Sequence, residues 1–149
     1  MRRIVLAVGL VVLAVACGSG STGGAAKGGD STGTQVTFVP DPLRTGAAVT
    51  FTVTVANGTS TALDLTFPTG QRADVTLAKG DTVLYQWSRG LLFTQMVGHV
   101  RVPAGGHEAF TLESRSFDVP AGTYRLHAVV TASNHMDLGI TREVTVRSS

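Results

Sequence analysis

Four histidines are the side chains of this sequence best suited to bind a metal, and two methionines could add soft ligands for copper. They are His99, His107, His127 and His135, with Met96 and Met136. His99 and His127 alternate with apolar neighbours, so each is expected to point outward from a half-buried strand. No pair has the spacing of a recognised ligand set, and the sequence therefore predicts neither a metal site nor a cofactor.

A recognisable set of catalytic residues is also missing from the sequence. No serine lies in a recognisable nucleophile turn, the sharp strand-to-helix turn that positions the nucleophile of many hydrolases. Asp74 and Asp81 flank one expected strand. Paired carboxylates that perform acid–base chemistry need a cleft, however, and a small β domain seldom provides one. We therefore expect no catalytic residue and no enzymatic activity.

The N-terminal residues have the layout of an export signal. Arg2 and Arg3 precede a continuous apolar run, IVLAVGLVVLAVA, that ends just before Cys17. This run is shorter than the roughly 20 residues that a membrane-spanning helix needs. Residues 1–16 are therefore expected to be a signal peptide, and the small residues before Cys17 resemble the lipobox of bacterial lipoproteins. Cleavage there would leave a lipid on Cys17; ordinary signal cleavage without lipid is the alternative.

This interpretation predicts a protein that is lipid-anchored to the bacterial cell membrane or envelope and faces outward. Residues 17–34 would then form the lipidated Cys and a flexible tether rich in Gly, Ser and Thr. The chain has 12 Lys and Arg against 10 Asp and Glu, and loss of Arg2 and Arg3 leaves 10 of each. A neutral domain with scattered basic residues offers no electrostatic surface for nucleic acid, so we expect no nucleic-acid binding.

Residues 35–149 have the size of one domain and a hydrophobic period of two almost throughout. Val49, Phe51 and Val53 alternate with threonines, as in an antiparallel strand with one buried face. Similar segments follow at short spacing, separated by turns rich in Gly and Pro, and no window shows a helical stripe. Eight or nine such strands predict a single all-β domain, an immunoglobulin-like antiparallel β-sandwich.

Five positions refine this prediction. Tyr124 follows a Pro-Ala-Gly-Thr turn and resembles the tyrosine corner of such sandwiches, in which the hydroxyl bonds back to the main chain. Trp87 is expected to fill the core between the two sheets. Leu126 stands where antibody domains carry a Cys, so packing should replace the disulfide. Asn57 and Gly58 are interpreted as the turn of a β-hairpin.

A spaced motif of aromatic, Gly, Gln, Asp and Ser residues extends through the second half of the chain. Its positions are Phe67, Gly70, Gln71, Asp74, Tyr85, Trp87, Ser88, Phe93, Gln95, Gly122 and Tyr124. With the Pro-Ala-Gly turn at Pro103, this motif resembles the BsuPI-type intracellular proteinase inhibitor family. The resemblance implies an immunoglobulin-like domain that inhibits serine proteinases. The founding inhibitor is intracellular, whereas this chain has an expected export signal.

Most motif residues are expected to serve the fold rather than a partner. The aromatic residues should belong to the core, and Gln71, Asp74 and Ser88 should cap turns or bond the main chain. The contact with a partner is therefore sought elsewhere, in a short connection between expected strands.

That connection is the candidate partner-binding loop, and it consists of Arg89, Gly90, Leu91 and Leu92. Presented in extended form, Arg89 would suit a proteinase pocket with an acidic floor, and either leucine would suit an apolar pocket. The alternative is that both leucines fold under and seal the end of the sandwich.

Two functions remain open at this point. The first is a lipid-tethered inhibitor that blocks a serine proteinase at the cell envelope. The second is a non-enzymatic immunoglobulin-like module that binds another surface protein or a polysaccharide, or that acts as a structural adaptor. The partners expected are thus a proteinase or another envelope protein, and the membrane through the lipid on Cys17.

Overall fold

The computed structural model describes residues 31–149, and in these residues the chain forms strands and loops but no helix. The strands are β1 (Thr32–Val39), β2 (Leu43–Arg44), β3 (Val49–Asn57), β4 (Leu63–Phe67), β5 (Ala73–Lys79), β6 (Thr82–Gln86), β7 (Gly98–Val102), β8 (His107–Ser114), β9 (Gly122–Val130) and β10 (Gly139–Arg147). The described residues form ten strands, whereas the sequence predicted eight or nine. One of the ten, β2, has only two residues and is too short to show a pattern in the sequence. No helix long and apolar enough to cross a bilayer occurs in residues 31–149.

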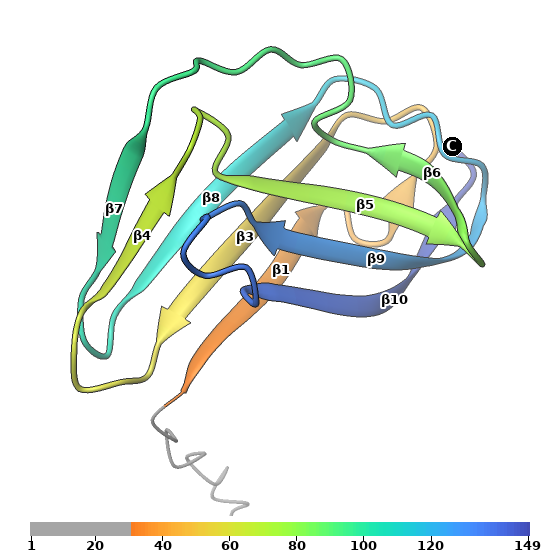
Figure 1. Cartoon of the computed structure of the whole chain (residues 1–149). Coiled ribbons are helices and arrows are strands. Elements are labelled where there is room, and N and C mark those ends of the chain that lie inside the picture. The colour runs from red at the N-terminus through yellow and green to blue at the C-terminus, as the bar shows by residue number, and fades with distance from the viewer. Residues whose placement is uncertain (1–30) are drawn as a thin grey trace, which may run out of the picture.

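The strands form two main sheets and one two-stranded sheet. The first sheet has the order β1-β3-β8, the second β2-β10-β9-β5-β6, and the third β4-β7. All pairings are antiparallel except that of β2 with β10. In Figure 1 the first sheet lies obliquely behind the second, and the β4-β7 pair stands beside β8. The facing antiparallel sheets, formed without a helix in the described residues, confirm the predicted all-β, immunoglobulin-like sandwich.

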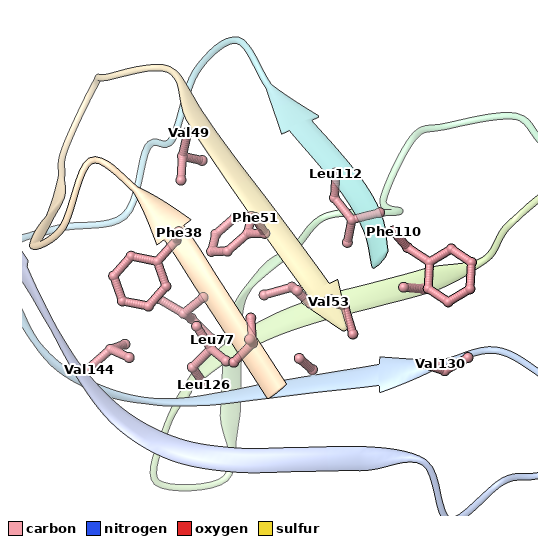
Figure 2. Packing of buried hydrophobic residues seen from close by; sticks show 14 of the residues in the cluster. Phe38, Val49, Phe51, Val53, Leu77, Phe110, Leu112, Leu126, Val130 and Val144 are labelled. Carbon is pink, nitrogen blue, oxygen red and sulfur yellow. The ribbon is translucent and has the colours of Figure 1, made fainter. Parts of the chain in front are cut away.

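The core lies between the two main sheets and follows the period of two seen in the sequence. On β3, Val49, Phe51 and Val53 are buried and the intervening threonines are half-buried. On β9, Leu126 is fully buried, and packing occupies the place of a disulfide as expected. Figure 2 shows Phe51 of the first sheet and Leu77 of the second as members of the same buried apolar cluster. Each large apolar side chain buried in this way contributes about 1.5–3 kcal/mol relative to exposure.

The first strand begins earlier than the sequence predicted. Thr32 pairs with Asn57, and the pairing continues to Val39 opposite Thr50. Residues 32–34 were assigned to the tether because they carry no large apolar side chain, but backbone pairing with β3 alone suffices to hold them in the sheet. The expected signal peptide, Cys17 and the rest of the tether lie outside the described residues.

Asn57 and Gly58 do not form the turn of a β-hairpin, so this prediction is wrong. They end β3, and the chain then moves to β4, which belongs to a different sheet. The Asn57 side chain is buried, and its Nδ2 donates to the carbonyls of Thr61 (2.8 Å), Val102 (3.1 Å) and Pro103 (3.1 Å). Its Oδ1 accepts from the Thr59 N–H and hydroxyl. These bonds bind the β3–β4 and β7–β8 connections together.

The two ends of the sandwich are therefore distinct (Figure 1). At the Asn57 end, defined by residues 57–61 and 102–106, β1 begins and β3 finishes. The connection between β6 and β7, residues 87–97, passes over the opposite end of β8 and is called the β6–β7 loop below.

Candidate functional site

The β6–β7 loop carries four of the eight large apolar side chains that are exposed in residues 31–149. Leu92 is 99% exposed, Met96 70%, Val97 59% and Leu91 45%. The alternative that both leucines fold under and seal the end of the sandwich is therefore wrong for Leu92, whereas Leu91 is partly covered. Apolar side chains that a loop leaves exposed to solvent are typical of contact sites.

The loop begins with two tight turns. The Arg89 N–H donates to the Gln86 carbonyl (3.2 Å), and the Leu91 N–H donates to the Ser88 carbonyl (3.0 Å). Gly90 has a φ of 81° at the third position of the second turn, where a type II turn requires a positive φ. Arg89 is thus held inside the turns, whereas residues 91–97 continue without a turn or bend. Leu92 is the most exposed residue of this extended part.

Asp74 anchors the start of the loop. It lies at the beginning of β5, and only 8% of its surface is exposed. Its Oδ1 accepts from the N–H groups of Val75 (2.9 Å) and Ser88 (3.1 Å), and its Oδ2 accepts from the Ser88 hydroxyl (2.6 Å) and Gln86 Nε2 (2.8 Å). Gln86 Nε2 also donates to Ser88 Oγ (3.0 Å). We call Asp74, Gln86 and Ser88 the Asp74 clamp.

The far side of the loop has a second set of contacts. The Gly70 N–H donates to the Thr94 carbonyl (2.8 Å), and the rings of Trp87 and Phe93 lie 5.9 Å apart. A Cβ on Gly70 would lie 2.5 Å from Thr94 Oγ1, which explains why this position suits glycine. The loop is therefore supported on both sides of Leu91 and Leu92.

Trp87 does not fill the core between the sheets, as the sequence suggested. It follows the last residue of β6, is half-buried, and packs against the edge of the core. Its Nε1 donates to the Glu113 carbonyl of β8 (3.0 Å). The periodic pattern of β6 runs through Trp87 in the sequence, but the strand ends one residue earlier and the indole instead joins the loop to the edge of the first sheet.

The remaining aromatic motif residues lie in or beside the core. Phe67 is fully buried and its ring lies 5.8 Å from Phe110. Tyr85 is half-buried, with its ring 4.8 Å from Phe117. The Tyr124 hydroxyl donates to the Pro120 carbonyl (2.8 Å), which is the geometry of a tyrosine corner.

Three polar or glycine positions of the motif make local contacts. Gln71 Nε2 donates to the Ala73 carbonyl (3.3 Å), next to the Asp74 clamp. Gln95 is exposed, and its Nε2 donates to the Phe93 carbonyl (3.2 Å). Gly122 opens β9, and its φ of 156° lies at the border of the region that favours glycine. Several motif residues therefore support the β6–β7 loop, although most residues of the motif do not face solvent.

The histidines do not gather into a site. His99 Nδ1 lies 3.3 Å from the Thr66 hydroxyl, and His127 Nδ1 lies 2.9 Å from the Thr141 hydroxyl. Within residues 31–149 no group of three metal-ligating side chains is present. Asp81 lies in the β5–β6 turn, at the other end of β5 from Asp74.

The described sheets define an immunoglobulin-like β-sandwich with the β6–β7 loop at one of its ends. The chain belongs to the BsuPI family, described as intracellular proteinase inhibitor, whose family model matches residues 36–135. The resemblance found in the sequence is thereby confirmed. No curated protein matches the chain in sequence.

Solved structures with the same fold share little sequence with this chain. Spo0M, a sporulation control protein from Bacillus subtilis, is 14% identical with a TM-score of 0.55, and the match covers 80% of this chain and 50% of that one. The CARDB domain of the PF1109 protein from Pyrococcus furiosus, solved with di-metal ions, is 16% identical with a TM-score of 0.45, covering 80% and 94%. At these identities the likeness concerns the fold alone.

Proposed function

We propose that the protein inhibits a serine proteinase by presenting the β6–β7 loop to the enzyme's cleft, with Leu92 in an apolar specificity pocket. The observation that carries the proposal is the 99% exposure of Leu92 at the start of an extended segment that is supported on both sides. Membership of a family described as proteinase inhibitors supports the same function.

The geometry of the loop favours Leu92 over Arg89 as the inserted residue. Arg89 lies within two consecutive turns, whereas a serine proteinase binds its substrate segment in extended form. Leu92 follows the turns and precedes a segment without a bend. We therefore expect targets with an apolar pocket, and we expect enzymes with an acidic pocket to be inhibited weakly.

The proposal includes presentation from a membrane. β1 begins at the Asn57 end, so a tether reaching back to lipid on Cys17 would join the domain at the end opposite the β6–β7 loop (Figure 1). Such an attachment would direct Leu92 away from the lipid surface. The target would then be an exported proteinase that approaches from outside the membrane.

A titration of three enzymes with the purified full chain tests the inhibitory role. Subtilisin and chymotrypsin have apolar pockets and should be inhibited, whereas trypsin should not. Leu92→Ala should weaken inhibition by about 30-fold, since a central anchor is worth roughly 2 kcal/mol. Met136→Ala is the matched control because Met136 is also exposed (84%) but lies in the β9–β10 connection.

Two results would count against the proposal. Absence of inhibition by micromolar protein in all three titrations would refute the inhibitory function. Equal inhibition by Leu92→Ala and the wild type would show that Leu92 is not the inserted residue. Recovery of a non-proteinase partner from envelope extract by both proteins would instead favour a binding module that uses another surface.

A further inference from the structure

The Asp74 carboxylate is unusual among the described residues in being both charged and buried. Among the buried residues of 31–149, only Asn57 and Asp74 carry an amide or a charged side chain. Asp74 makes no salt bridge there, so its charge is balanced only by four donors, two of which are main-chain N–H groups. Three of these four bonds come from Gln86 and Ser88, which lie where β6 passes into the loop.

Holding a turn with a buried carboxylate that has no cation beside it carries a desolvation cost. Desolvating a charge is unfavourable unless hydrogen bonds replace its hydration. Hydrogen bonds to a charged acceptor are stronger than neutral ones, and together they restrict the residues that donate them. Asp74 therefore limits the motion of Ser88, and with it the two turns that lead to Leu92.

We infer that Asp74 is the positioning residue that makes the β6–β7 loop an inhibitor rather than a substrate. The inference rests on the proposed function and assigns a role in it to a residue that does not touch the enzyme. A loop that fits a proteinase cleft is ordinarily cleaved and released. Inhibition requires that the two sides of the attacked bond remain in place after attack.

The chemistry at the Leu92–Phe93 bond shows what the supports must do. The enzyme's serine hydroxyl adds to the Leu92 carbonyl, the C–N bond breaks, and the serine proton is transferred through the enzyme's base to the Phe93 amine. The products are an ester on Leu92 and a free amine on Phe93. If the amine stays close, it attacks the ester and restores the peptide; if it leaves, water hydrolyses the ester.

Both sides of that bond are held in this structure. Phe93 packs on Trp87, and the Thr94 carbonyl accepts from the Gly70 N–H, so the amine side is retained. The ester side is linked through two turns to Ser88, which the Asp74 carboxylate binds through both its N–H and its hydroxyl. Loss of the Asp74 clamp would free the ester side and favour hydrolysis.

Asp74→Asn is an isosteric change that breaks the clamp. In one orientation the new amide places its NH₂ group against the two main-chain N–H groups at Oδ1. In the other, the NH₂ group faces Gln86 Nε2 and the Ser88 hydroxyl, which must turn from donor to acceptor. In both, the negative charge that strengthens the four bonds is lost. Ser88→Ala is a milder change that removes one donor and leaves Asp74 in place. Asn57→Ala, at the opposite end of the sandwich, removes five hydrogen bonds without touching the loop.

The experiment measures inhibition and cleavage in the same samples of full chain. Each variant, shown to be folded by circular dichroism, is incubated with subtilisin; residual activity gives the inhibition constant and intact mass gives the rate of cleavage at residues 88–97. Asp74→Asn should be cleaved there at least about tenfold faster than wild type and inhibit about tenfold less well. Ser88→Ala should change both quantities in the same direction by less, and Asn57→Ala should change neither.

The outcomes separate this inference from the proposed function. If the wild type inhibits and both Asp74→Asn and Ser88→Ala inhibit equally well without faster cleavage, the role of Asp74 is refuted while the inhibitory loop stands. If Asn57→Ala is cleaved at the loop as fast as Asp74→Asn, global destabilisation explains the result and the positioning role fails. If the wild type inhibits no enzyme, the proposed function fails. If, in addition, Asp74→Asn is cleaved in the loop no faster than the wild type, the positioning role of Asp74 fails as well.

Discussion

The two ends of the sandwich are each organised by one buried polar side chain, but Asn57 both donates and accepts hydrogen bonds whereas Asp74 only accepts them. Asn57 donates to three carbonyls of the β3–β4 and β7–β8 connections. Asp74 accepts from four donors around the β6–β7 loop. Each residue thus supplies the partner that its own loops lack, since a buried main-chain group left without a partner is strongly unfavourable.

The two ends also differ in the side chains that they expose to solvent. The connections at the Asn57 end carry mainly Gly, Ser, Thr and Ala, whereas the β6–β7 loop exposes Leu91, Leu92, Met96 and Val97. A buried polar residue alone therefore does not mark a functional loop. Support combined with exposed apolar side chains distinguishes the β6–β7 loop from the other end.

The largest expected effect comes from reversing the polarity of the Asn57 end. Asn57→Asp would place carboxylate oxygen against the carbonyls that now accept from Nδ2. An uncompensated buried charge of this kind should lower the free energy of unfolding by about 3–5 kcal/mol. Urea denaturation at neutral pH measures the loss. A loss below about 1 kcal/mol would contradict the importance given to the amide donor.

The sequence predicted the strands well where burial has a period of two. Val49, Phe51 and Val53 on β3 and Leu126 on β9 were placed on their buried faces, because alternation is a local property that each strand carries in its own residues. The Tyr124 corner was predicted for the same reason, since its hydrogen bond spans only four residues.

The supports of the two ends could not be predicted because their partners are distant in the sequence. Asn57 resembles a hairpin turn locally, yet it bonds to Val102 and Pro103. Asp74 and Ser88 were expected to bond main chain or cap turns, but the sequence did not show that they bond each other. A pattern of residue types identifies such groups as polar and does not reveal which of them the fold brings together.

Two glycines allow the ends to be compared with matched substitutions. Gly90 in the β6–β7 loop has φ of 81° and Gly105 at the Asn57 end has φ of 67°, and a Cβ on either would meet no atom within 4 Å. Gly90→Ala and Gly105→Ala should each lower the free energy of unfolding by about 1–2 kcal/mol, because alanine is strained at positive φ.

Only the change at Gly90 should affect inhibition. It strains the turn that leads into Leu91 and Leu92, whereas Gly105 lies in the connection next to Asn57. Urea denaturation and inhibition of subtilisin, measured on both variants, check this expectation. Equal weakening of inhibition by the two alanines would show that loop presentation depends on overall stability rather than on the local turn.

The smallest effects concern two buried hydroxyls that lack a hydrogen-bond partner of good geometry among the described residues. Thr34 on β1 lies opposite Val55 toward the Asn57 end, and Tyr85 lies on β6 below the loop. Thr34→Val and Tyr85→Phe keep the side-chain shape and remove an unsatisfied polar atom. Each should therefore leave the free energy of unfolding at neutral pH unchanged or slightly higher.

The two hydroxyls should differ only in alkaline solution. Burial raises the pKa of Tyr85 above 10.0, an effect that the nearby Ser114 side chain partly opposes and Asp74 reinforces. Below that pH both the folded and the unfolded chain keep the proton, and the group contributes no pH dependence. Above it the unfolded chain loses the proton first, so stability falls until the pH passes the folded-state pKa.

Urea midpoints measured from about pH 8 to pH 11 test this difference. Wild type and Thr34→Val should share an alkaline decline that is smaller in Tyr85→Phe. Because Tyr85 packs against Phe117 beneath the Asp74 clamp, its ionisation would disturb the loop end of the core first. Cleavage at residues 88–97 should therefore accelerate with pH in the wild type before the whole domain unfolds, and an identical acceleration in Tyr85→Phe would exclude this phenol as the cause.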